Sequence, residues 1–396
     1  MKNRIAVVGA GIIGSAVAFE LTRCGADSVD VLDPDLEGEL SSTERNAGGV
    51  RHLWIHPVNA ELSRRSIEYF EKVREEIGFH QNGYLWLYSQ QSSALGEKAL
   101  VLAQKRGLPY EALEGKAITA RYPFLDKIDD VAFGVHGRKD GILNSNALKL
   151  HYQNGAKKRG ARFQDRTLVK GIAESGATVQ LMVSHPPTGE AARESLKSPS
   201  HWAGSELLTY DQVVICAGAW SSEILKSLSL AGITKPVRRQ IATFQAENLD
   251  LTPYGMIVDT SGVYFHAEGG NCLAGIVLKN EPEGYRFHLD NDFFETHIWP
   301  PLFERSSKME RLRPLTGWGG LYSYSPDITG ILGPVPGTKR VYEAHSFTGH
   351  GVMHSLGAAA VISETILFGA PKTPEMAQLS RDRFVSGRLL DERLHI

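Results

Sequence analysis

The first 33 residues read as a strand, a glycine turn, a helix and a second strand that ends in an acid. The turn carries Gly9, Gly11 and Gly14 in the spacing G-x-G-x-x-G, and Asp33 closes the second strand. Gly9 is expected to make the tight turn, Gly11 to let a pyrophosphate approach the backbone, and Gly14 to let the helix pack closely on the strand. The phosphates would then lie at the helix N-terminus, and Asp33 would accept hydrogen bonds from the adenosine ribose. The chain is therefore expected to bind an ADP-containing dinucleotide.

Charge and cysteine content exclude several classes of partner. The 396 residues have room for two domains, and a formal net charge of −2 gives no field that would attract nucleic acid or anionic lipid. No apolar run reaches the ~20 residues of a membrane span, and the few residues before the first strand leave no room for a signal peptide. Cys24, Cys216 and Cys272 form no C-x-x-C pair, which argues against a disulfide framework, a zinc site and an iron–sulfur cluster. We expect a cytoplasmic protein without a metal or a transmembrane segment.

The pattern changes along the chain. Asn59 is expected to cap an amphipathic helix that ends at Gly78. Residues 184–205, rich in Pro, Ser, Gly and charge, are interpreted as an exposed hairpin excursion. Short alternating runs between residues 236 and 322 predict an antiparallel sheet. The last helix is expected over residues 352–368, directly after a glycine loop.

Two further segments favour a flavin over a nicotinamide. One is the turn Ala217-Gly218-Ala219-Trp220 after an apolar strand, and the other is the loop Gly349-His350-Gly351 at the start of the last helix. A helix N-terminus carries about half a positive charge. Reduced flavin becomes anionic, so a helix aimed at it would stabilise that state, whereas a nicotinamide becomes neutral on reduction. The alternative is that the loop only starts a helix.

Taken together, these segments resemble the D-amino-acid-oxidase-like family of FAD-dependent oxidoreductases, which includes sarcosine and dimethylglycine oxidases and dehydrogenases, and glycine oxidase. The resemblance covers nearly the whole chain and is most specific in residues 325–334 and 347–351. It implies an α/β fold, α+β overall, in which a Rossmann-like FAD-binding domain is interleaved with an antiparallel-sheet substrate domain. The FAD-binding domain is expected to comprise residues 1–87, 142–235 and 322–396, and the substrate domain residues 88–141 and 236–321.

The resemblance also implies which residues contact the cofactor. The ADP half is expected at the glycine turn and Asp33, with the adenine beside the backbone of Val169. The remaining cofactor-binding positions are expected to be Thr43, Asn46, Ala47, Gly48, Gly49, Ala217, Gly218, Trp220, Gly349, His350, Gly351, Val352 and Met353.

Members of this family oxidise a C–N bond next to a carboxylate. Arg51 follows the flavin-lining loop and is the expected carboxylate anchor, because a guanidinium can bind a carboxylate through two hydrogen bonds. Tyr264 and His266 lie two residues apart on a predicted strand, hence on one face, and are further catalytic candidates together with His350. For each of these side chains the alternative is a structural role, such as an ion pair or a packed core histidine.

The chain also departs from the sarcosine oxidase pattern. Leu273 and Met353 correspond to two lysines, one that promotes reaction with oxygen and one that binds the substrate carboxylate. Gly320 corresponds to the cysteine that links flavin covalently, and Asn46 lies near the linking histidine of dimethylglycine dehydrogenases. We therefore expect non-covalent FAD, a dehydrogenase rather than an oxidase, and a quinone or carrier protein as electron acceptor. The missing lysines argue against a small glycine-like substrate.

The leading hypothesis is FAD-dependent oxidation of an amino or N-alkylamino acid by hydride transfer to flavin. A second hypothesis, from another class, is an FAD-binding assembly or interaction protein whose flavin is structural. A third is a dehydrogenase of a 2-hydroxy acid or of glycerophosphate from the same superfamily.

Overall fold

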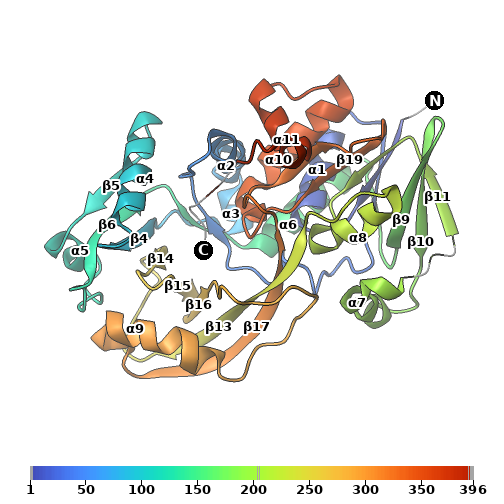
Figure 1. The fold of residues 1–396 in the computed structure, drawn as a ribbon. Coiled ribbons are helices and arrows are strands. Elements are labelled where there is room, and N and C mark those ends of the chain that lie inside the picture. The colour runs from blue at the N-terminus through green and yellow to red at the C-terminus, as the bar shows by residue number, and fades with distance from the viewer. Residues whose placement is uncertain (1–2, 203, 205, 391, 393–396) are drawn as a thin grey trace.

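The computed structural model describes residues 3–202, 204, 206–390 and 392 of the chain (Figure 1). Within these residues, helices alternate along the chain with strands, and the strands form four sheets of six, three, eight and two strands. This is the predicted α/β architecture with an α+β part.

The six-stranded sheet is the frame of the dinucleotide-binding half. Its strand order is β18-β19-β12-β1-β2-β8, parallel throughout except at the edge strand β18. The chain crosses from β1 to β2 through α1, as the fingerprint predicts. The strands are β1 (Arg4–Val8), β2 (Ser28–Leu32), β8 (Arg162–Gln164), β12 (Gln212–Ile215), β18 (Ile331–Pro334) and β19 (Val341–His345).

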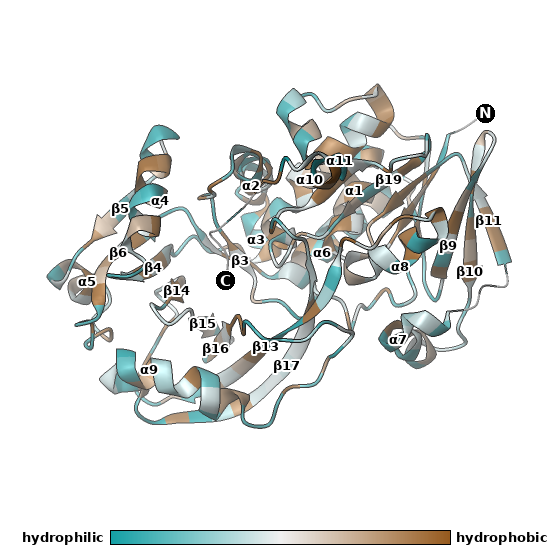
Figure 2. Ribbon diagram, viewed as in Figure 1, coloured by the Kyte–Doolittle hydropathy of each residue, from teal (hydrophilic) through white to brown (hydrophobic). Residues whose placement is uncertain are grey.

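Helices α1 (Ile12–Arg23), α6 (Ser145–Lys158) and α10 (Gly351–Phe368) form the apolar layer beside this sheet. Figure 2 shows that α10 consists largely of hydrophobic residues. Of the described residues, α10 is the one stretch that is long and apolar enough to cross a membrane, and most of it is buried inside the protein. Its composition is therefore explained by packing against α1 and α2 (Pro57–Phe70).

The eight-stranded sheet forms the second lobe, with strand order β17-β13-β16-β15-β14-β4-β6-β5. Its neighbours are antiparallel except for β14 and β4, which run parallel. Helices α4 (Ser93–Lys105), α5 (Lys116–Arg121) and α9 (Trp299–Arg305) accompany it. The strands are β4 (Tyr84–Ser89), β5 (Tyr110–Leu113), β6 (Val131–Gly137), β13 (Lys235–Ala246), β14 (Met256–Val258), β15 (Tyr264–Glu268), β16 (Asn271–Ile276) and β17 (Leu312–Tyr324).

Each lobe is assembled from separate stretches of the chain, which fits the predicted interleaving. The predicted boundaries at residues 87/88 and 321/322 fall inside β4 and β17, both of which belong to the eight-stranded sheet. The exact domain limits stay a prediction. The remaining elements are β3 (Gly49–Val50), β7 (Gly141–Ile142), β9 (Leu168–Ser175), β10 (Thr178–Ser184), β11 (Glu206–Tyr210), α3 (Arg74–Ile77), α7 (Gly189–Lys197), α8 (Ser221–Leu225) and α11 (Asp382–Ser386).

One local prediction was wrong and another was incomplete. Asn59 does not cap a helix, because α2 already begins at Pro57, whose fixed φ suits the first helical position, and His56 is the N-cap. The segment after residue 184 is the predicted hairpin excursion, because it connects β10 to its antiparallel neighbour β11, but the sequence did not reveal the helix inside it. It contains α7, whose N-cap hydroxyl on Thr188 accepts a hydrogen bond from the Ala191 amide at 3.2 Å. The helix buries Leu196 on its apolar face. This face was not recognised in the sequence because the segment is mostly polar and charged.

Candidate cofactor and substrate site

A long cavity runs between the two lobes. It is lined by the carboxyl end of β1, the N-termini of α1 and α10, and residues of the eight-stranded sheet. It encloses about 1870 Å³, including space open to solvent at its mouth. Because the cavity extends from the glycine turn after β1 to the eight-stranded sheet, its length suits a dinucleotide.

The glycine turn after β1 is shaped by close backbone contacts. Gly9 has a φ of +102°, and a Cβ added there would lie 2.6 Å from the carbonyl oxygen of Cys216. A Cβ on Gly14 would lie 1.8 Å from the carbonyl oxygen of Gly9. Gly11 lines the cavity, where an added Cβ would meet the Thr43 hydroxyl at 3.4 Å, an ordinary contact. Gly9 and Gly14 are therefore required by the backbone packing, and Gly11 keeps space free for a ligand.

Asp33 lies at the end of β2 and faces the cavity. Its carboxylate accepts hydrogen bonds from the amides of Ala10 at 2.5 Å and Asp35 at 2.8 Å. Burial raises the pKa of Asp33 to about 6 in the ligand-free protein, although these two amides oppose the rise. Hydroxyl groups of a bound ribose would favour the ionised carboxylate, and contact with a ribose stays a prediction.

Asp33 should make the stability of the ligand-free protein depend on pH. The folded protein holds this proton more tightly than the unfolded chain, so the stabilisation is complete below pH ~4 and is lost as the pH rises through about 6. The rise in pKa from 3.8 to about 6 corresponds to ~3 kcal/mol. Urea unfolding of the wild type and of Asp33→Asn between pH 4 and pH 7 measures the difference. A difference that does not change with pH would contradict this assignment.

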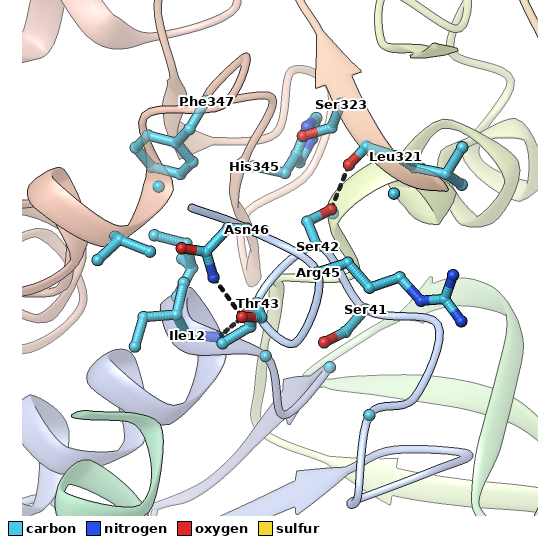
Figure 3. Close-up of a pocket in the computed structure, with 18 of the residues that line it drawn as sticks. Ile12, Ser41, Ser42, Thr43, Arg45, Asn46, Leu321, Ser323, His345 and Phe347 are labelled. Carbon is cyan, nitrogen blue, oxygen red and sulfur yellow. Dashed lines mark hydrogen bonds between the residues drawn. The ribbon is translucent and has the colours of Figure 1, made fainter. Parts of the chain in front are cut away.

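The loop after β2 is fixed by its own polar side chains (Figure 3). The amide of Ile12 donates to the Thr43 hydroxyl at 2.9 Å, which ties the loop to the N-terminus of α1. The Asn46 side chain donates to the carbonyl of Thr43 and accepts from the Gly48 amide at 2.6 Å and the Ser145 hydroxyl at 2.7 Å. Thr43 and Asn46 both line the cavity. Their hydrogen bonds hold the loop in one conformation before any ligand binds.

The last residues of this loop approach the second lobe. Ala47, Gly48 and Gly49 line the cavity. A Cβ on Gly49 would lie 1.9 Å from the hydroxyl oxygen of Tyr84, so the backbone and this phenol are in close contact. The loop thus connects the dinucleotide end of the cavity with the sheet that covers the other end.

The opposite wall contains the residues of the second glycine turn. Val169, Ala217, Gly218 and Trp220 line the cavity as expected. The indole N–H of Trp220 donates to the Leu196 carbonyl at 2.7 Å. Since Leu196 belongs to α7 and also lines the cavity, this helix forms part of the wall, which the sequence did not reveal.

The N-terminus of α10 opens into the cavity. Gly349 has a φ of +83°, and a Cβ there would lie 2.3 Å from the ring of Tyr322. His350 is the N-cap residue but makes no side-chain cap hydrogen bond. Gly351, Val352 and Met353 line the cavity in the first turn. The unpaired amides of this turn present a partial positive charge to a ligand.

Arg51 is buried and still lines the cavity. Its guanidinium carbon lies 3.9 Å from the ring centre of Trp54 and 5.3 Å from that of Trp86. One Nη donates to the carbonyl of Leu53 at 3.0 Å. The cation is therefore held between aromatic faces with its orientation fixed, which suits recognition of a carboxylate.

The two strand candidates have different environments. Tyr264 lines the cavity, whereas His266 does not. The His266 ring is fully buried, its Nδ1 lies 2.7 Å from the carbonyl oxygen of Ala267, and burial lowers its pKa to about 4. The His266 ring is therefore enclosed by protein and does not line the cavity with Tyr264. His350 lines the cavity, with its ring centre 4.6 Å from that of Trp54.

Several residues of the cavity were not predicted from the sequence. Tyr84 and Arg239 come from strands far apart in the sequence. Lys149 lies on α6, donates to the Glu37 carbonyl at 3.0 Å and pairs with Glu44. The sequence signal for Lys149 and Arg239 is weak, because a single basic residue on a helix or strand is usually solvated.

The fold and the cavity together are typical of a dinucleotide-binding protein, in which the eight-stranded sheet covers the end of the cavity away from the glycine turn. A family model described as FAD dependent oxidoreductase matches residues 4–365. The chain therefore belongs to this family of FAD-dependent oxidoreductases, and the resemblance found in the sequence is confirmed.

Individual relatives match this chain over most of its length but at low sequence identity. FAD-dependent oxidoreductase domain-containing protein 1 of Xenopus laevis is 27% identical, over 98% of this chain and 84% of its own length. Monomeric sarcosine oxidase of Bacillus sp. (strain B-0618) is 24% identical, over 92% of both chains. The crystal structure of L-proline dehydrogenase from P. horikoshii superposes with a TM-score of 0.85 at 23% identity, over 98% of this chain and 99% of that one. This last likeness shows the fold alone.

Proposed function

We propose that the protein oxidises the C–N bond of an amino or N-alkylamino acid and transfers the hydride to non-covalent FAD. The observation that carries this proposal is the buried Arg51 guanidinium in the cavity that the N-terminus of α10 also lines. Among the described residues that line the cavity, the carboxylates are Asp33 and Asp35, and both follow β2 at the dinucleotide end. The substrate end is therefore positively charged and suits an anion.

The residues present fit FAD. The glycine turn at β1 and the carboxylate of Asp33 suit the ADP half, and the loop of residues 43–49 together with the first turn of α10 suits the flavin. When bound, FAD supplies the hydride acceptor that no amino-acid side chain can provide.

The side chains of the substrate end bind, orient and exclude water. Arg51 would hold the carboxylate of the substrate through two hydrogen bonds. Tyr84, Tyr264 and Tyr322 line the cavity, and burial raises the pKa of each phenol, so all three stay neutral at physiological pH. Positive charge without a nearby carboxylate favours the neutral amine of the substrate, which is the form that can release a hydride.

Two observations support non-covalent FAD and an acceptor other than oxygen. Gly320 lines the cavity and offers no thiol, and the Asn46 side chain is engaged by loop hydrogen bonds. Leu273 is buried in an apolar cluster with Tyr264 and Ile241, so no ammonium group is present at that position to promote reaction with oxygen. We propose a quinone or an electron-carrier protein as acceptor. Faster turnover with oxygen than with an artificial acceptor would contradict this.

Anaerobic addition of the correct substrate should bleach the ~450 nm band of the bound flavin. N-methyl, cyclic and primary amino acids form the test set, and 2-hydroxy acids and glycerol phosphate form the control set. Bleaching by a member of the control set, with every amine inactive, would overturn the assignment to C–N oxidation.

A further inference from the structure

Arg239 also lines the cavity, and the proposed reaction gives it no role. It lies on β13, on the same face as Ile241, which also lines the cavity. Its guanidinium carbon lies 5.2 Å from the ring centre of Tyr322, and one Nη donates to the Arg238 carbonyl at 3.0 Å. Within the described part of the chain its Nε is buried without a hydrogen-bond partner, and no carboxylate pairs with it.

The neighbouring Arg238 provides a direct contrast. It points to the other face of β13, where it pairs with Glu281 and Asp290, each at 2.7 Å. An arginine removed from water is normally compensated in this way, because an unpaired charge in a protected site is costly. Arg239 has the same backbone setting but no such partner, and the groups it faces are those of the cavity. An anionic ligand would supply the missing partner.

Arg51 and Arg239 are anchored at different places. Arg51 is stacked on Trp54 in the segment after β3, whereas Arg239 lies over Tyr322. Burial raises the pKa of Tyr322, and the charges of Arg239 and Arg51 both oppose that rise. The charge of Arg51 also acts on Tyr84, and that of Arg239 on Tyr264. The aromatic wall of the cavity is therefore within electrostatic reach of two separately held guanidinium groups.

Arg51 already offers a two-point contact to one carboxylate, and Arg239 is held separately from it, over Tyr322. We infer that the substrate carries two acidic groups, of which the α-carboxylate binds Arg51 and a second carboxylate binds Arg239. This inference rests on the proposed function and specifies its substrate class: an amino or N-alkylamino acid with a second acid on its nitrogen substituent or side chain. It also gives the cavity a way to select against glycine-like substrates, which would leave Arg239 unpaired.

The test compares matched pairs that differ in the second acid. N-methylglycine is compared with N-carboxymethylglycine, and alanine with aspartate, by the rate of anaerobic flavin reduction at limiting substrate. The wild-type holoenzyme should prefer the dianionic member of at least one pair by about 10-fold or more, and Arg239→Gln should lower that preference by about 10-fold, to near parity. Arg239→Lys, which keeps the charge but loses the fork, should restore part of it.

A binding measurement separates this inference from the proposed function. Diglycolate and methoxyacetate carry an ether oxygen in place of the amine and cannot be oxidised at a C–N bond, so each is titrated against the flavin spectrum of the holoenzyme. Tighter binding of diglycolate that is lost in Arg239→Gln supports the second anion site even if no amine is turned over. Equal binding of the two probes, or equal effects of Arg239→Gln on both, overturns the inference. In that case bleaching by monoanionic amines would leave the proposed function intact.

Discussion

Gly14→Ala should leave little stably folded protein, even in the absence of a cofactor. The added methyl carbon would lie 1.8 Å from the carbonyl oxygen of Gly9 and 2.9 Å from its carbonyl carbon. Neither atom can move aside easily, because Gly9 directly follows β1, which is hydrogen-bonded to β2 and β12. Overpacking of a core costs ~1–3 kcal/mol and occasionally more, and this contact lies at the severe end. Urea unfolding of the FAD-free variant and its soluble yield measure the effect.

Gly11→Ala is the matched control, because Gly11 is not required by backbone packing. Its added Cβ would meet the Thr43 hydroxyl at 3.4 Å, which the fold tolerates. We expect the FAD-free stability to change by less than ~1 kcal/mol, whereas FAD affinity should fall because the methyl group occupies space in the cavity. An equal loss of FAD-free stability in both variants, or unchanged FAD affinity in Gly11→Ala, would contradict the division of roles within the fingerprint.

Arg51→Ala should lower kcat/KM for the amino-acid substrate by about 10²–10³-fold, because truncating one partner of a buried charge pair costs ~2–5 kcal/mol. FAD content should be retained, since the cofactor is expected to be held mainly by the glycine turn, the loop of residues 43–49 and α10. The rate of anaerobic flavin reduction as a function of substrate concentration provides the measurement, and the flavin-to-protein ratio provides the control.

Arg51→Lys distinguishes charge from geometry. The ammonium group keeps the positive charge but cannot form a two-point contact or stack on Trp54 in the same way. We expect an activity between those of the wild type and Arg51→Ala. If Arg51→Ala keeps FAD and its full cellular function, the flavin has a structural role and the assignment of Arg51 to a substrate carboxylate fails.

Local signals in the sequence predicted the cofactor end of the cavity well. The roles of Gly9, Gly14 and Asp33 depend on contacts within one strand–helix–strand unit, so their spacing determines where they lie. The loop at Gly349 was recognisable for the same reason, because a glycine before a long apolar helix leaves few alternatives.

The substrate end could not be predicted to the same extent. Tyr84 and Arg239 reach the cavity through strand pairings such as β4 with β14 and β13 with β17, which join distant parts of the chain. Alternation on β15 correctly placed Tyr264 and His266 on one face, but it could not show that the protein encloses His266. α7 was missed because its charged residues outnumber the apolar ones that it buries.

The proposal that this chain binds FAD is tested most directly by the absorbance spectrum of the purified protein before and after reconstitution with FAD. We expect a yellow protein with a flavin band at ~450 nm, close to one FAD per chain, and full release of the flavin on denaturation. A protein that stays colourless after reconstitution, or that binds a nicotinamide dinucleotide in this cavity instead, would contradict the assignment of FAD to this cavity.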